Sequence, residues 1–76
     1  MDNAPLPASL PITTDPNIVS GVPVFRGTRV PVQSLFDHLE AGDSIESFLE
    51  GFRSVKREQV IKLLEICRAE TLAPAI

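Results

Sequence analysis

The chain has 76 residues, 43% of them hydrophobic, a single cysteine and a formal net charge of −3. This length allows one domain at most, which buries only about 60% of its unfolded surface, and the lone Cys67 excludes an internal disulfide or a multi-cysteine zinc site. No apolar run approaches the roughly 20 residues that span a bilayer, and the N-terminus lacks the basic and apolar regions of a signal peptide, which leaves the cytoplasm as the expected location.

The first segment, residues 1–11, contains three prolines among small and apolar residues. This composition predicts an extended arm ahead of a folded domain over residues 12–71. Leu6, Leu10 and Ile12 make the arm apolar enough to contact a second subunit or a partner. An ordinary frayed terminus would have the same composition.

The second segment, residues 15–30, carries several turn signals. Asp15-Pro16-Asn17 favours a turn because proline fixes φ and its neighbours can bond nearby backbone. Val24-Phe25 and Val30 flank Gly27 on either side. We expect a short hairpin or extended excursion around this glycine, with strands too short to form a sheet of their own.

Two amphipathic helices are predicted next, over residues 31–41 and 45–51. In both, apolar residues recur at i, i+3, i+4 and i+7, the spacing of one buried helix face. Gly42 stands where a left-handed residue ends a helix. Ser44 is a favourable N-cap for the second helix, and Glu46 in its first turn suits the helix dipole.

A third helix is predicted over residues 57–71, followed by a tail over 72–76. Its core stripe consists of Val60, Leu63, Leu64 and Cys67. Ile61 and Ile66 fall outside that stripe and widen the apolar face. The wider face either packs within the domain or contacts a second subunit or partner. The whole pattern predicts a mainly α, three-helix helix-turn-helix bundle with a short N-terminal β excursion.

Two sequence runs indicate a family. Residues 21–32 read G-V-P-V-F-R-G-T-R-V-P-V, and residues 57–60 read R-E-Q-V. Both runs resemble the DUF 433 family (domain of unknown function), in a match that covers about residues 12–67. The resemblance implies a homeodomain-like fold and pairing with PIN-like ribonuclease toxins in bacterial toxin–antitoxin operons. Such antitoxins block the toxin and repress their own promoter as dimers.

Two positions depart from that family's pattern. Lys56 stands at the N-cap of the third helix, where Ser or Thr is usual, and Arg53 stands where Pro is usual. Both changes add positive charge to the turn before the helix. We expect the two changes to weaken the cap by about 1 kcal/mol and to favour contact with a phosphate.

The basic residues gather where a helix-turn-helix protein contacts DNA. Such proteins insert the second helix of the motif in the major groove, with its N-terminal residues on base edges. Residues 51–76 carry a local charge of +2, whereas residues 1–50 carry −5. Replacing both Arg57 and Gln59 by alanine is expected to abolish operator binding and leave the fold intact. The predicted DNA-contacting residues are Arg53, Lys56, Arg57, Gln59, Lys62, Arg26 and Arg29.

Arg26 and Arg29 flank the Gly27 turn and could reach backbone phosphates or an acidic partner, and Arg29 could make a structural bond instead. For Arg29 the candidate partners are Asp37 and a helix C-terminus. Catalysis and metal binding are not expected, since His38 is the single histidine, the serines lack a base and Gly27 is too isolated to cradle a phosphate. No cofactor is implied.

The sequence therefore predicts a non-enzymatic type II antitoxin that neutralises a PIN-like toxin and autorepresses its operon as a homodimer. A stand-alone transcriptional regulator and a protein-interaction module without DNA binding are the alternatives. The residues predicted to form the partner or dimer interface are Leu6, Leu10, Ile12, Ile61 and Ile66.

Overall fold

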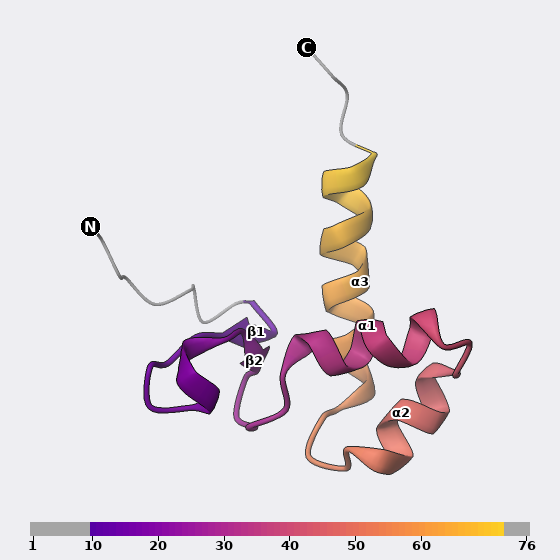
Figure 1. The fold of residues 1–76 in the computed structure, drawn as a ribbon. Helices are drawn as coiled ribbons and strands as arrows, with labels where there is room; N and C mark the ends of the chain where they lie inside the picture. Colours follow the sequence, from indigo (N-terminus) through magenta and orange to yellow (C-terminus); the bar gives the residue numbers. More distant parts are fainter. Residues whose placement is uncertain (1–9, 73–76) are drawn as a thin grey trace.

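The structure is a computed structural model that describes residues 10–72 (Figure 1). It confirms the predicted class, a mainly α bundle of three helices preceded by a short antiparallel sheet. No described helix is both long enough and apolar enough to cross a membrane. The elements are β1 (Ile12–Thr13), η1 (Val19–Gly21), β2 (Val24–Phe25), α1 (Val32–Glu40), α2 (Ile45–Gly51) and α3 (Arg57–Thr71).

Strand β2 is the centre of the N-terminal region. On one side it pairs with β1, with Ile12 opposite Phe25. On the other side it meets the chain that returns from the Gly27 turn, where Phe25 N donates to Val30 O at 3.0 Å. Gly27 has φ +80°, as a tight turn requires. The predicted excursion around Gly27 is therefore present, but the pairing with β1 was not predicted.

The buried Thr28 stabilises this turn from inside. Its hydroxyl donates to Phe25 O at 2.8 Å and accepts from Val30 N at 3.0 Å. A threonine side chain here replaces backbone bonds that a two-residue strand cannot supply.

Helices α2 and α3 have the predicted bounds, and α1 is one residue shorter at each end than predicted. Gly42 has φ +89°, and the Ser44 hydroxyl accepts from Ser47 N at 3.0 Å, so the predicted stop and cap are both confirmed. Lys56 makes no side-chain cap bond to α3, because an ammonium group has no acceptor.

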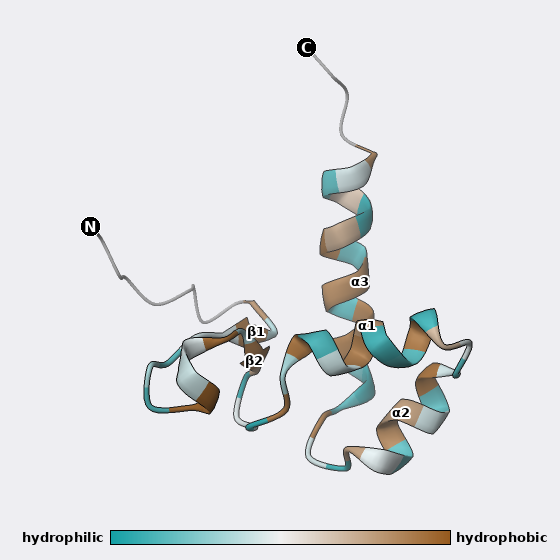
Figure 2. Ribbon diagram, viewed as in Figure 1, coloured by the Kyte–Doolittle hydropathy of each residue, from teal (hydrophilic) through white to brown (hydrophobic). Residues whose placement is uncertain are grey.

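The core lies where the three helices cross beside β2. Phe48 is fully buried, and its ring centre lies 6.1 Å from that of Phe25 and 4.9 Å from that of Phe52. Figure 2 shows hydrophobic and hydrophilic residues alternating along all three helices, as amphipathic helices require. The buried hydrophobic residues are Val24, Phe25, Leu35, Phe48, Val55, Val60 and Leu63.

The folded region begins earlier than predicted. Pro11 is buried, and its carbonyl accepts from Arg26 N at 2.8 Å. Residues 10–11 therefore belong to the domain and not to an arm. The rest of the predicted arm, with Leu6, and residues 73–76 of the predicted tail lie outside the described residues. Of that predicted tail, Leu72 is the C-cap residue of α3.

Candidate nucleic-acid interface

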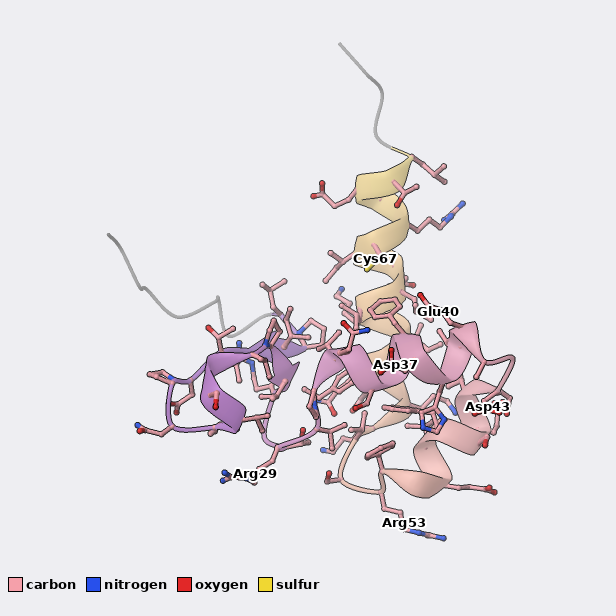
Figure 3. The ribbon with its side chains drawn as sticks, in the orientation of Figure 1. Arg29, Asp37, Glu40, Asp43, Arg53 and Cys67 are labelled. Carbon is pink, nitrogen blue, oxygen red and sulfur yellow. The ribbon has the colours of Figure 1, made fainter. Side chains whose placement is uncertain are left out.

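The connection between α2 and α3 places basic side chains at the surface. Val55, the fourth residue of this five-residue turn, is only 4% exposed and anchors the turn in the core. Its backbone N donates to Phe52 O at 3.0 Å. With Val55 facing inward, Arg53 and Lys56 on either side of it are exposed. Figure 3 shows Arg53 pointing away from the helices.

The first turns of α3 continue this basic surface. Val60 and Leu63 face the core, whereas Arg57 and Lys62 are exposed. The Arg57 guanidinium pairs with Glu46 of α2 at 2.8 Å, and both side chains stay more than half exposed, at 55% and 62%. We call Arg53, Lys56, Arg57 and Lys62 the basic front of α3.

The pKa of Glu46 is held below its usual value. Hydrogen bonding from the backbone at Glu46, in the first turn of α2, is the largest cause, and the hydrogen bond and charge of Arg57 come next. The ion pair links α2 to the start of α3. At this exposure its contribution to stability is small.

The surface beside the basic front is open and of mixed charge. A shallow depression of about 570 Å³ runs along α3 next to it. Glu58 and Glu65 alternate there with the basic residues, so the net positive charge is slight. Strong non-specific binding to DNA is not expected from such a surface. The depression is lined by Lys56, Arg57, Glu58, Ile61, Lys62 and Glu65.

Gln59 has a structural position. Its Oε1 accepts from Lys56 N and its Nε2 donates to Arg26 O, both at 2.9 Å. The first bond satisfies the backbone N–H of the N-cap residue, which is the half of a capping box that the third helical residue supplies, and the second ties α3 to the residue after β2. Replacing Gln59 by alanine would therefore disturb the fold, contrary to the expectation that the Arg57 and Gln59 double substitution leaves it intact.

The two arginines beside Gly27 differ in their surroundings. Arg26 Nε donates to Leu10 O and its Nη2 to Ile12 O, each at 2.9 Å, so Arg26 makes structural bonds that the sequence did not predict. Arg29 is exposed and points away from the domain (Figure 3). Of its two candidate partners, Asp37 accepts from Gln33 Nε2 at 2.9 Å, and among residues 10–72 no ion pair joins Asp37 to Arg29.

The predicted interface residues within the described chain do not form one surface. Ile61 is 41% exposed and lines the depression beside the basic front. Ile12 lines a different, apolar groove, and Ile66 is half-buried. Leu10 lines a third depression together with Arg26.

His38 is a residue whose role the sequence did not reveal. Its ring packs edge-on against Phe48 and Phe52, at centre distances of 5.5 and 5.7 Å. Its Nδ1 lies 3.1 Å from Asp43 Oδ2. The i, i+4 spacing of Phe48 on α2 and Phe52 at its C-cap was the signal for an aromatic cluster facing α1. Among residues 10–72, no group of three or more metal-ligating side chains is found.

Comparison with known proteins identifies the family. The family model described as "Protein of unknown function (DUF433)" matches residues 12–65. The uncharacterized protein y4eO of Sinorhizobium fredii (strain NBRC 101917 / NGR234) is 43% identical over 49 residues, which are 64% of this chain and 22% of that protein. No solved structure matches the chain. Since the family model covers well over half of its residues, the chain belongs to the DUF433 family.

Proposed function

We propose that this protein is a cytoplasmic DNA-binding regulator of the antitoxin type, which contacts its operator through the basic front of α3. The observation that carries the proposal is the turn at Val55, whose burial exposes Arg53 and Lys56 beside Arg57. A helix with its side chains is about 10–12 Å wide and fits the major groove, which is about 12 Å wide.

The basic residues would divide the contacts between them. Arg57 stands in the first turn of α3, where a guanidinium can bond guanine or phosphate. Lys56, Lys62 and Arg53 flank it and suit phosphate contacts, which position the protein without reading sequence. In free protein Arg57 is held by Glu46 at 2.8 Å. DNA would therefore compete with Glu46 for this guanidinium.

Negatively charged residues gather on α1 and the turn after it. Asp37, Glu40 and Asp43 are all exposed there (Figure 3). A ribonuclease must hold RNA on a basic surface, so an acidic surface supports a complex with a PIN-like toxin through charge complementarity. In this proposal the protein binds DNA through the basic front of α3 and the toxin through the acidic surface of α1.

DNA binding is tested by gel retardation of the DNA upstream of the gene. Arg57→Ala is expected to weaken binding at least about tenfold, because a bidentate arginine contact contributes roughly 1–3 kcal/mol. Arg68→Ala is the matched control, since it removes an exposed arginine from the last turn of α3. Glu46→Gln should strengthen binding by releasing Arg57. Equal retardation by all four proteins would contradict the proposal.

A protein-interaction module without DNA binding is the second candidate, favoured by Glu58 and Glu65 on the same surface as the basic front.

Co-purification with the product of the adjacent gene tests toxin binding separately. Glu40→Lys should weaken that complex if the acidic surface is used, with Glu70→Lys on α3 as the matched control. A stand-alone regulator would retard DNA and co-purify with no neighbouring product.

A further inference from the structure

One side of α3 is exposed along the first half of the helix, where side chains recur at the spacing i, i+3, i+4 and i+7. That spacing places them on one helix face, nearly opposite the face where Val60 and Leu63 enter the core. These side chains are all exposed, and they line the shallow depression of about 570 Å³ beside the basic front. We call Glu58, Ile61, Lys62 and Glu65 the outer stripe of α3.

Ile61 is the apolar member of the outer stripe. Its side chain is 41% exposed although charged residues surround it in the depression. The other large hydrophobic side chains exposed within residues 10–72 lie elsewhere, since Val19 and Val22 precede β2 and Leu72 is the C-cap residue of α3. Arg57 stands one turn before Ile61, and the i, i+4 spacing makes them neighbours on the helix surface. An apolar group is therefore exposed directly beside the arginine that is proposed to contact DNA.

The outer stripe suits the edges of bases better than the DNA backbone. Glu58 and Glu65 would repel phosphates, and the Ile61 side chain has no donor with which to bond one. In the major groove, by contrast, a carboxylate can accept from cytosine N4, and an apolar side chain can contact the C5 methyl group of thymine. Contact with that methyl group would remove the exposed surface of Ile61 from water, which is favourable for an apolar side chain.

We propose that Ile61 contacts the C5 methyl group of a thymine in the operator and so helps to determine which sequence is bound. This assignment rests on the proposed function, because Ile61 meets a base only if α3 enters the major groove. Ile61 is four residues after Arg57, which corresponds to about 6 Å along the helix. Successive bases of a strand are about 3.4 Å apart, so the thymine lies about two base pairs from the group that Arg57 contacts.

The experiment removes the methyl groups from the DNA and the side chain from the protein, separately and together. Gel retardation compares the upstream duplex with the same duplex in which deoxyuridine replaces every thymidine, which removes the C5 methyl group and keeps the O4 acceptor. The wild type should bind the uracil duplex at least about fourfold more weakly, the factor that corresponds to burial of one methyl-sized group. Ile61→Ala should bind the thymine duplex as weakly as the uracil duplex.

Two further variants separate a base contact from general effects. Val22→Ala is the matched control, because Val22 is also 41% exposed but lies outside α3, and it should keep the wild-type preference for thymine. Ile61→Val keeps a branched apolar side chain and should show a preference between those of the wild type and Ile61→Ala. Circular dichroism checks that each variant folds, as expected for exposed positions. An effect of uracil on the duplex itself is shared by all the proteins and cancels in this cycle.

The outcomes distinguish this assignment from the proposed function. Suppose that Arg57→Ala weakens binding to both duplexes, but that the wild type shows no preference for thymine or Ile61→Ala keeps the same preference. Then α3 binds DNA without a methyl contact at Ile61, and only the assignment is overturned. Equal weakening of both duplexes by Ile61→Ala has the same meaning. If the wild type retards neither duplex, the proposed function fails together with the assignment.

Discussion

The Gln59 side chain joins α3 to the turn before it and to the residue after β2. Its removal should lower the free energy of unfolding more than the removal of most half-buried polar side chains does. In Gln59→Ala, Lys56 N loses its acceptor and Arg26 O loses its donor, which are two bonds of 2.9 Å. A neutral hydrogen bond contributes about 0.5–1.5 kcal/mol to stability. Lys56 is exposed, so water replaces that bond at the low end of the range. The bond to Arg26 O is partly buried and belongs at the high end.

We therefore expect Gln59→Ala to reduce the free energy of unfolding by about 1–2 kcal/mol, which lowers Tm by roughly 5–15 °C in a domain of this size. Thermal unfolding followed by circular dichroism measures this. Gln59→Glu separates the bonds, because its carboxylate still accepts from Lys56 N but cannot donate to Arg26 O. Lys62→Ala, an exposed change on the same helix, should stay within about 0.5 kcal/mol of wild type. A Gln59→Ala protein that melts with the wild type would refute the reasoning.

Three further changes test the core, a cap and the ion pair. Phe48→Ala removes a fully buried ring and should cost about 3–5 kcal/mol in urea unfolding, most of the stability that a chain of 76 residues has. Ser44→Ala should cost about 1 kcal/mol in the same assay, and Ser44→Gly less, since α2 loses the bond to Ser47 N. Because the folded pKa of Glu46 lies below its unfolded value, its contact stabilises the fold above the unfolded pKa and is lost as pH falls through the folded pKa. In Glu46→Gln, Tm should therefore fall less than in the wild type as the pH is lowered. The same fall of Tm in both proteins would show that the contact does not contribute to stability.

The helices were predictable because their signals are local. Apolar spacing of i, i+3, i+4 and i+7, with Gly42 and Ser44 as stop and start, sets α1 and α2 to within one residue. The pairing of β1 with β2 was not predictable, since two-residue strands have no measurable periodicity. The early start of the domain was not predictable either, because residues 10–12 are too few to show periodicity. Their carbonyl groups accept hydrogen bonds from Arg26.

The candidate site was predicted only in part. The outward position of Lys62 follows from helix periodicity once Val60 and Leu63 are assigned to the core, but the exposure of Arg53, Lys56 and Arg57 does not. The bond between Gln59 and Arg26 joins residues 33 positions apart, and no spacing rule reports such a contact. A glutamine in the first turn of a basic helix therefore has the pattern of a base-reading residue, and its bonds to Lys56 and Arg26 could not be predicted from that pattern. The cluster of His38 with two phenylalanines was missed because it spans two helices.

The salt dependence of operator binding tests the central claim most directly. For each phosphate contact, log K falls with log salt concentration by a slope of about 0.9. If the basic front contacts the DNA backbone, Lys62→Ala should reduce the slope by about 1, whereas Arg68→Ala should leave it unchanged. Identical slopes for the wild type and Lys62→Ala, or a change confined to Arg68→Ala, would show that DNA does not bind at the front of α3.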